Sequence, residues 1–500
     1  MYRFLLLPLI LSVALAPAAS PQATPQTEQQ AAVPKLYPPA VTRHRGTFNG
    51  KIVAYTATVD ETIVPNAAGR PAARIVSIVY TADGADPATR PVLFVSNGGP
   101  ISPSAYLHMI GLGPRVLSIP ENLHADTSAF KLVDNPHTVL DVADLVFFDP
   151  ASTGWSRVLD GVKVEEYYTT DADAQQFAAF VDRWTREHGR TASPKYLLGE
   201  SYATIRVPEA AKQLARLPEP VLVDGVFLMG QAANQLEVNT RPYNIISPAI
   251  GLPSIAATAW YHGKIDRQGR TVFQHMDEAR QFSANEYINA LFKGTAALDS
   301  TTKTRIANKL QSLTGIAAEY FLANNLRITR PVFQQELLKR EGLKLGSDDA
   351  RYKGPLKGPE PDAGPSSAAP GVFEAYAKSE LNVTRTEEYR RRQLPPSTAT
   401  GGRGGAPWSY APIASPFGDF PYTSAITEVM NKNPKFRVYI GSGIYDMKTT
   451  TGAADYLVAQ SGWPKSRVHV SYYEGGHMAY TNPRALAQFT ADVRAMVEGR

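Results

Sequence analysis

Short apolar runs alternate with amphipathic segments between about residues 36 and 240, and this alternation is the strongest pattern in the chain. Several runs are apolar at almost every position, which is typical of parallel strands that are buried on both faces. The predicted strands are residues 73–82, 91–96, 144–149, 195–199 and 224–230. Between the third and fourth strands, an apolar face repeats at helical spacing and ends before Gly189; it consists of Phe177, Phe180, Val181 and Trp184. Strands separated by such helices predict a doubly wound, mostly parallel α/β sheet.

The middle of the chain, from about residue 250 to 345, has a helical pattern instead, as in residues 285–294 and 303–313. Two segments rich in Pro and Gly follow it, residues 353–371 and 394–408. Neither composition suits the interior of a regular helix or strand. We therefore interpret this part of the chain as a mostly helical cap with loose linkers.

The α/β pattern returns near the C-terminus. Apolar strands are predicted at residues 436–443 and 467–476, and Asn482 and Pro483 open a final helix with one apolar face. These elements are expected to complete the first sheet. The predicted organisation is an α/β core in two parts, residues 36–245 and 406–500. The predicted cap, residues 246–405, is inserted between them.

The first residues have the pattern of a signal peptide. Arg3 precedes an apolar run from Phe4 to Ala16, and small residues that suit cleavage after Ala18 follow it. A membrane anchor is the alternative interpretation, but the run is shorter than the ~20 residues that cross a bilayer. We predict a signal peptide at residues 1–18 and, because residues 19–35 are rich in Pro, Gln and Ala, a disordered tether after it.

Composition and charge narrow the class of protein and its compartment. The chain has 500 residues, of which 43% are hydrophobic and 19% charged, so it can bury the core of a globular enzyme. Its net charge of +5 comes from 51 basic and 46 acidic residues without a dense Lys/Arg run, so nucleic acid is not an expected partner. It has no cysteine, which excludes disulfides and thiolate catalysis. We predict an exported bacterial protein, periplasmic or secreted, without stable membrane insertion once the signal is removed.

A candidate nucleophile lies where a predicted strand turns into a predicted helix. The segment Gly199-Glu200-Ser201-Tyr202-Ala203 has small residues at both ends of a tight turn, as in the nucleophile elbow that holds a serine above an α/β sheet. An ordinary strand-to-helix turn is the alternative. A serine hydroxyl needs a base to accept its proton, and that base needs an acid to orient it and stabilise its charge. In this fold the three residues are expected in the order Ser, acid, His.

Two downstream residues occupy the positions expected for the acid and the base. Asp446 lies just past one apolar strand, and His477 lies just past the next, after two glycines that permit a sharp turn. Taken singly, a loop Asp is more often a capping or turn residue, and a loop His is more often a surface residue. Together with the elbow they predict a triad of Ser201, Asp446 and His477. No histidine or carboxylate spacing matches a metal motif, so we expect neither a metal nor a cofactor.

A triad also requires an oxyanion hole, because the charge that develops on the attacked carbonyl oxygen must be met by preorganised donors. The strand at residues 91–96 ends in Asn97-Gly98-Gly99-Pro100, where glycine lets backbone N–H groups approach a ligand closely. We predict that the N–H groups of Gly99 and Tyr202 form the pair, with a plain Gly-Pro turn as the alternative.

Five blocks, in order across the α/β portion, resemble the serine carboxypeptidase family: Asn97–Pro100, residues 148–158, Gly199–Ala203, the Asp446 segment and Gly476-His477-Met478. The resemblance implies an α/β-hydrolase fold with the triad given above. It also implies that the terminal carboxylate of a peptide substrate is bound by Asn97, Gly98 and Glu200. A carboxylic acid can hydrogen-bond to a substrate carboxylate only while one of the two keeps a proton, so such an enzyme should favour acid pH. For Glu200, a first-turn acid favoured by the helix dipole is the alternative.

The chain departs from the family pattern at four positions. The family usually has Trp, Gly, Gly and an aromatic residue where this chain has Val95, Ile101, Thr204 and Arg206. The sequence predicts a serine carboxypeptidase that acts through an acyl-enzyme on Ser201. The alternatives are an esterase or acyltransferase with the same triad, and a non-catalytic binding protein on a hydrolase scaffold.

Overall fold

The computed structural model describes residues 36–123, 126–391, 408–410 and 422–500. Residues 37–500 form one compact unit. The predicted signal peptide at 1–18, the predicted tether at 19–35 and most of the segment 394–408 lie outside the described residues, so these assignments stay predictions. None of the helices in the described part of the chain is long and apolar enough to cross a membrane.

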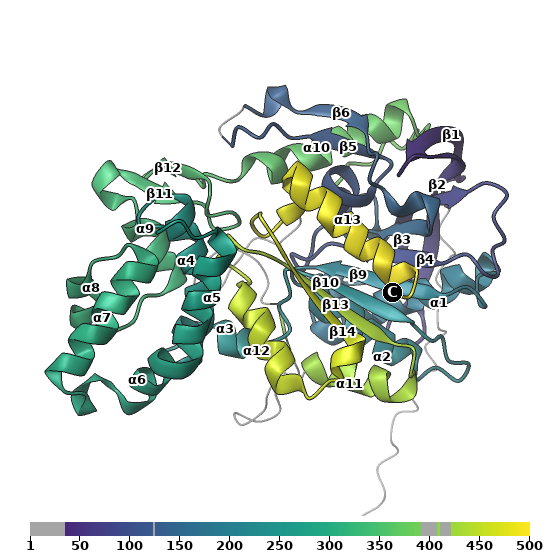
Figure 1. Cartoon of the computed structure of the whole chain (residues 1–500). Helices are drawn as coiled ribbons and strands as arrows, with labels where there is room; N and C mark the ends of the chain where they lie inside the picture. Colours follow the sequence, from purple (N-terminus) through teal and green to yellow (C-terminus); the bar gives the residue numbers. More distant parts are fainter. Residues whose placement is uncertain (1–35, 124–125, 392–407, 411–421) are drawn as a thin grey trace, which may run out of the picture. The chain divides into compact units, whose positions relative to one another are not determined.

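Within the described residues, a ten-stranded mixed sheet forms the centre of the unit (Figure 1). In spatial order it consists of β1 (Ala40–Phe48), β2 (Lys51–Pro65), β3 (Pro71–Ala82), β7 (Asp144–Phe148), β4 (Val92–Ser96), β9 (Lys195–Glu200), β10 (Gly225–Met229), β13 (Arg437–Gly443) and β14 (Val468–Tyr473), with β8 (Arg157–Val158) beside β3. The strands from β7 to β14 in this order are parallel to one another. Every strand predicted from the sequence is present, with small differences at its ends. The predicted doubly wound, mostly parallel sheet is confirmed.

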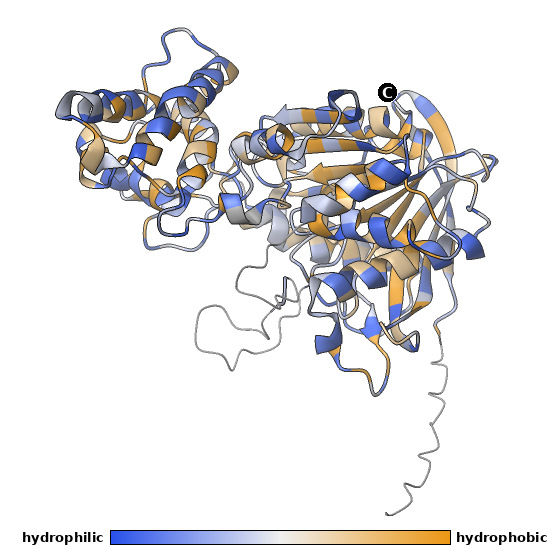
Figure 2. Ribbon diagram, turned by 90° about the horizontal axis from the view of Figure 1, so that it is seen from below, coloured by the Kyte–Doolittle hydropathy of each residue, from blue (hydrophilic) through white to orange (hydrophobic). Residues whose placement is uncertain are grey.

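Helices cover both faces of the sheet, because successive residues of a buried strand point to opposite sides. In β4, Leu93 and Val95 belong to the core on one side, and Val92 and Phe94 belong to the core on the other. The first core is closed by α10 (Gly364–Ser379) and α13 (Pro483–Val497), and the second by α1 (Thr170–Glu187), α2 (Ala203–Leu214) and α11 (Tyr422–Lys432). Figure 2 shows that the strands of the sheet are mostly apolar and that the helices beside it carry both apolar and polar residues.

A helical region inserted after β10 has a hydrophobic core of its own, which includes Leu252, Tyr287, Leu310 and Phe321. Its helices are α4 (Ile246–Tyr261), α5 (Val272–Phe282), α6 (Ile288–Lys293), α7 (Ser300–Thr314), α8 (Ala318–Ala323) and α9 (Arg330–Glu336). A short hairpin of β11 (Leu343–Leu345) and β12 (Lys353–Pro355) follows them. The helical pattern predicted for this part of the chain is confirmed, while the division of the chain into core and cap domains stays a prediction.

The prediction that residues 353–371 form no regular helix is wrong, because α10 begins at Gly364 and continues through Pro370. Pro365 occupies the first turn, where its missing N–H costs no hydrogen bond. Beyond Pro370, Phe373 and Tyr376 are buried in a core of the sheet and not in that of the cap. Their burial offsets the hydrogen bond that the internal proline removes.

β1 and β2 extend the sheet by an antiparallel hairpin that the apolar-run pattern does not predict. β1 alternates partly buried and exposed positions, and β2 alternates buried and partly buried positions over much of its length, unlike the continuous apolar strands of the parallel part. Asn49 and Gly50 form the turn with φ angles of 49° and 78°, as a two-residue hairpin turn requires. The Asn-Gly pair between alternating segments is the sequence signal for this hairpin.

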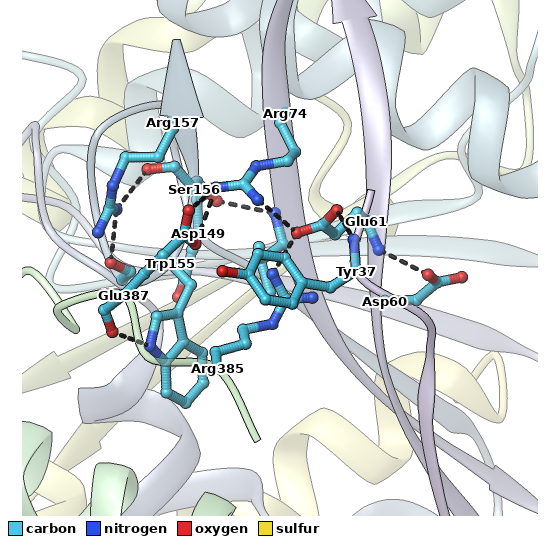
Figure 3. A network of polar contacts seen from close by, with 12 residues as sticks. Tyr37, Asp60, Glu61, Arg74, Asp149, Trp155, Ser156, Arg157, Arg385 and Glu387 are labelled. Carbon is cyan, nitrogen blue, oxygen red and sulfur yellow. Dashed lines mark hydrogen bonds and ion pairs between the residues drawn. The ribbon is translucent and has the colours of Figure 1, made fainter. Parts of the chain in front are cut away.

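A buried network of ion pairs ties the segment after α10 to the sheet (Figure 3). Glu61 on β2 accepts hydrogen bonds from Arg74 on β3 and from Arg385. Arg74 also donates two hydrogen bonds to Glu387, at 2.7 and 2.8 Å. Because Glu61, Arg74 and Arg385 are all buried, removing one partner would leave uncompensated charge inside the protein. The network therefore fixes where the chain returns to the sheet.

Candidate active site

The predicted site residues come together at one edge of the sheet. Asn97 follows β4, Ser201 follows β9, Asp446 lies past β13 and His477 lies past β14. These strands are parallel members of one sheet, so their carboxyl ends meet at the same edge. The candidate nucleophile, acid and base therefore share this edge with the Asn97–Pro100 turn.

Ser201 occupies a sharp turn between β9 and α2. Its φ angle of +57° lies in the left-handed region, which a residue with a side chain rarely adopts. Its N–H donates to Met229 O at 2.8 Å, which ties the turn to the end of β10. The predicted nucleophile elbow is present as a structure, and the catalytic role of Ser201 stays a prediction.

Asp446 and His477 form a buried pair in which the His477 Nδ1–H donates to Asp446 Oδ2 at 2.7 Å. Asp446 also accepts hydrogen bonds from the backbone N–H groups of Lys448 and Thr449, at 2.6 and 2.9 Å, and from the Thr449 hydroxyl. Burial alone would raise the pKa of Asp446, but the charge of His477 and these hydrogen bonds hold it below its ordinary value. Because an ionised carboxylate only accepts hydrogen bonds, Nδ1 of His477 must carry a proton, and neutral His477 keeps its lone pair on Nε2.

His477 lies beside the strand end that holds the elbow. A Cβ built on Gly230, the residue after Met229, would stand 3.1 Å from Cε1 and Nδ1 of His477. Within the described chain, the Ser201 hydroxyl makes no hydrogen bond with His477. Such contacts are often loose in ligand-free enzymes and tighten only when a substrate binds. The acid and the base are thus joined directly, and the base is adjacent to the turn that carries the serine.

The Asn97–Pro100 turn packs directly on the elbow. A Cβ on Gly98 would lie 2.6 Å from both Glu200 O and Tyr202 N, so only glycine allows this approach. Gly99 has a φ angle of +112°, a conformation that also favours glycine. The turn therefore brings Gly98 close to Tyr202 N, while the role of the Gly99 and Tyr202 N–H groups as an oxyanion hole stays a prediction.

Glu200 and Asn97 are in direct contact, as expected for a shared binding site. Asn97 Oδ1 accepts from Leu107 N–H at 3.0 Å, which turns Asn97 Nδ2 toward Glu200, and Nδ2 donates to Glu200 Oε2. Burial raises the pKa of Glu200 above its ordinary value. The nearby charge of His477 and the hydrogen bonds from Tyr480 and Asn97 act in the opposite direction and only partly cancel this effect. Glu200 is thus a buried carboxyl group that keeps its proton more readily than an exposed one.

Two of the departures from the family pattern have specific partners around the elbow. Thr204 Oγ1 donates to Ser201 O at 2.6 Å and accepts from Ala232 N–H at 2.8 Å. Arg206 is fully buried, and Asp173 on α1 binds its Nε and Nη2 at 2.7 and 3.1 Å. The sequence identifies both positions as unusual, but it does not reveal these contacts.

Arg206 also holds the Asn97–Pro100 turn in place by hydrogen bonds, a contact that we call the clamp. Its remaining N–H groups donate to Ser96 Oγ at 2.6 Å and to the carbonyl oxygens of Asn97 and Pro100, both at 2.7 Å. With Asp173, these acceptors use all five N–H donors of the guanidinium. Because the two carbonyl groups flank Gly98 and Gly99, the clamp determines how the N–H groups between them are oriented.

A loop of the inserted region also reaches the site. His477 N–H donates to Asp348 O, and Ala350 N–H donates to Tyr445 O at 3.0 Å. Burial lowers the pKa of His477, but the charge and hydrogen bond of Asp446 and, to a smaller extent, the Asp348 carboxylate raise this pKa above its ordinary value. Sequence patterns do not indicate this contact, because Asp348 is far from His477 along the chain.

The described residues contain no group of three or more His, Asp and Glu side chains arranged to hold a metal ion. The sequence-based expectation of no metal and no cofactor stays a prediction.

A comparison with protein families gives one match. The model of the family described as serine carboxypeptidase matches residues 78–340, which is more than half of the chain. The matched segment includes Asn97, Glu200 and Ser201 and ends before Asp446 and His477. The interpretation of these last two residues therefore depends on their geometry. A search of curated protein sequences finds no significant match.

One solved structure shows the same fold. A prohormone-processing carboxypeptidase from Saccharomyces cerevisiae is similar with a TM-score of 0.52 and 13% identity, over 89% of this chain and 90% of that chain. A proline iminopeptidase from Mycobacterium smegmatis has a TM-score of 0.36 and 14% identity, over 88% of this chain and 98% of that chain. The first likeness confirms the predicted α/β-hydrolase fold, a mostly parallel central sheet with flanking helices.

Proposed function

The chain belongs to the serine carboxypeptidase family and is a serine-type carboxypeptidase, and we propose that it releases C-terminal residues from peptides through an acyl-enzyme on Ser201, preferentially at acid pH. The observation that carries the proposal is the arrangement at the sheet edge. A serine in a left-handed turn and a buried His477–Asp446 pair occupy the same sheet edge, and a buried carboxyl group, Glu200, immediately precedes the serine.

The proposed acylation uses the free lone pair of His477. Nε2 takes the proton of the Ser201 hydroxyl as Oγ attacks the carbonyl carbon of the last peptide bond. The C–N bond then breaks, His477 gives the proton to the leaving amine, and the C-terminal amino acid departs. Water hydrolyses the ester by the same proton transfers in reverse order. Asp446 keeps His477 in the required tautomer and stabilises its charge.

The backbone N–H groups of Gly99 and Tyr202 are proposed to stabilise the oxyanion of each tetrahedral intermediate. The close approach of Gly98 to Tyr202 N supports this role, because it brings the two segments that supply the donors together. Asn97, Gly98 and Glu200 are proposed to bind the terminal carboxylate of the peptide. The close packing of these residues next to the serine supports this role, because the terminal carboxylate of a peptide lies one residue away from the attacked bond.

The acid preference follows from Glu200. An ionised Glu200 would repel a substrate carboxylate, whereas a protonated Glu200 can donate a hydrogen bond to it. Burial raises the pKa of Glu200, so the protonated form persists to higher pH than in an exposed glutamate. Binding of substrates with a free C-terminus is therefore expected to weaken as pH rises through the pKa of Glu200.

Two alternatives retain parts of this site. An esterase or acyltransferase would use the same triad without the carboxylate-binding residues, and would cleave substrates that have no free carboxylate. A non-catalytic binding protein would keep the fold but would not react with a serine-directed fluorophosphonate. The proposal also includes export to the periplasm or the medium, with peptides as the only proposed partners.

The proposal is tested by hydrolysis of an N-blocked dipeptide with a free or an amidated C-terminus at acid and at neutral pH. Release of the C-terminal amino acid from the free acid, weaker at neutral pH and lost in Ser201→Ala, is the expected result. Equal cleavage of the amidated peptide would remove terminal-carboxylate recognition from the proposal. Cleavage of esters alone would favour the esterase alternative.

A further inference from the structure

Tyr480 is a buried side chain that touches the proposed carboxylate-binding residues but is not among those predicted from the sequence. It lies in a short 3₁₀ helix, Ala479–Thr481, three residues after His477. Its ring is almost fully buried and packs against Phe489 of α13. Its hydroxyl donates to Glu200 Oε2 at 2.9 Å. Tyr480 therefore connects the loop that carries the base to the residue that precedes the nucleophile.

The hydrogen bonds of Glu200 are unevenly divided between its two oxygen atoms. Tyr480 O–H and Asn97 Nδ2–H both donate to Oε2, which fills the two acceptor positions of that atom. Among the described residues, no hydrogen bond is made to Oε1. When Glu200 is neutral, its proton is consequently carried by Oε1, and Oε2 acts as the carbonyl oxygen.

We propose that Tyr480 is a positioning residue that fixes the Glu200 carboxyl group, so that Oε1–H is presented to the C-terminal carboxylate of the peptide substrate. This inference rests on the proposed function, because it concerns the same recognition of a free C-terminus. Asn97 alone would leave one acceptor position of Oε2 open, and the proton could then occupy either oxygen. With Tyr480 in place, the Tyr480 and Asn97 donors are both satisfied only when the proton of Glu200 lies on Oε1.

The charged and titratable groups that face Glu200 come from two other parts of the chain. They are His477 and Tyr480 from the loops after β14, and Asp348 from the inserted region. Burial and Asp348 raise the pKa of Glu200, whereas His477, Tyr480 and Asn97 lower it. Removing the Tyr480 hydroxyl is therefore expected to raise the pKa of Glu200 while loosening the orientation of its carboxyl group.

The Tyr480→Phe variant tests this role, because it removes one hydroxyl and keeps the buried ring. At acid pH, the KM for a free-acid peptide is expected to rise roughly three- to ten-fold, as the loss of one hydrogen bond of ordinary strength predicts. The pH at which this KM begins to increase should move upward. kcat/KM for a blocked ester without a free carboxylate should stay unchanged. The measurements are KM and kcat for both substrates across the pH range.

Tyr473→Phe is the matched control. Tyr473 is also buried, also packs on Phe489, and donates to a carboxylate, Asp492 Oδ2, at 2.7 Å. Its variant should leave the KM for both substrates as in the wild type. If Tyr480→Phe leaves the free-acid KM unchanged, or raises the KM for ester and acid alike, the role of Tyr480 is overturned while the proposed function stands. If the wild type itself does not prefer free C-termini, the proposed recognition fails, and this inference fails with it.

Discussion

Glu200 and His477 are two buried titratable groups whose proton binding is coupled. The charge of each contributes to the pKa of the other, although burial is the largest single effect on both. The proposed reaction needs a proton on Glu200 and none on Nε2 of His477. That state holds one proton on the pair, so its population is greatest between the two macroscopic pKa values. A bell-shaped dependence of kcat/KM on pH follows for substrates with a free C-terminus.

Glu200→Gln is expected to remove the alkaline limb of this profile. The amide keeps an acceptor for Asn97 and Tyr480 and an N–H donor for the substrate, but it does not titrate. Only the acid limb, which reports protonation of His477, should remain, and free-acid peptides should still be cleaved at neutral pH. The measurement is kcat/KM against pH for wild type and variant. A variant that keeps the wild-type bell would show that Glu200 does not set the acid preference.

At the scale of elements, the sequence predicts the parallel strands and the elbow well. β4, β7, β9 and β10 are buried on both faces, so their apolar runs are continuous and easily recognised. β1 and β2 lie at one edge of the sheet, and the burial of their residues alternates. Their sequences therefore lack the continuous apolar runs by which the other strands are recognised. α10 is missed because Pro365 and Pro370 resemble linker residues, although tertiary burial stabilises the helix.

The partners of the site residues could not be predicted for a different reason. Arg206, Tyr480 and Asp348 act through contacts between distant parts of the chain. No local spacing encodes such contacts. For Arg206 and Thr204, the departure from the family pattern was the only available signal, and it marked the positions without giving their roles.

Arg206→Lys tests the clamp on the Asn97–Pro100 turn. A lysine keeps the charge but cannot donate at once to Asp173, Ser96 and two carbonyl groups. We expect kcat to fall about ten- to a hundred-fold, because misplaced oxyanion donors stabilise the transition state less. The loss of buried hydrogen bonds should also lower the free energy of unfolding by about 1–3 kcal/mol. Both quantities are measured, by steady-state kinetics and by denaturant unfolding.

Arg190→Lys provides the control for this variant. Arg190 is a buried arginine that binds Asp144 Oδ2 at 2.6 Å and Arg90 O at 2.8 Å, near the start of β7 and away from the site. Its variant should lose stability but keep kcat. An Arg206→Lys enzyme that is destabilised to a similar degree with unchanged kcat would contradict the positioning role.

At the scale of the whole molecule, the inserted region contacts the α/β part of the chain at His477, the proposed catalytic base. The backbone of Asp348 binds the His477 loop, and the Asp348 side chain forms an ion pair with Lys448, two residues after Asp446. The inserted region therefore contributes charge to the site through Asp348. Its sequence carries no motif that would reveal this coupling.

Asp348→Asn is expected to shift the whole pH profile of kcat/KM to lower pH. The carboxylate raises the pKa of both His477 and Glu200, so its removal lowers both values, while the backbone contact to His477 is kept. The profile is compared with that of Glu360→Gln, which removes a charge from the same segment but whose carboxylate binds the Ser347 N–H and, within the described chain, makes no hydrogen bond or ion pair with His477. Identical shifts in the two variants, or none in Asp348→Asn, would exclude a specific effect of Asp348.

The most direct test of the central claim is covalent labelling of the folded enzyme with a fluorophosphonate, followed by mass spectrometry of its peptides. The account predicts one phosphonyl adduct on Ser201, with labelling strongly reduced in His477→Ala because the hydroxyl then has no base. Ser102 and Ser104, in the turn beside the elbow, should remain unmodified. No adduct, or an adduct on a serine other than Ser201, would contradict the assignment of Ser201 as the nucleophile.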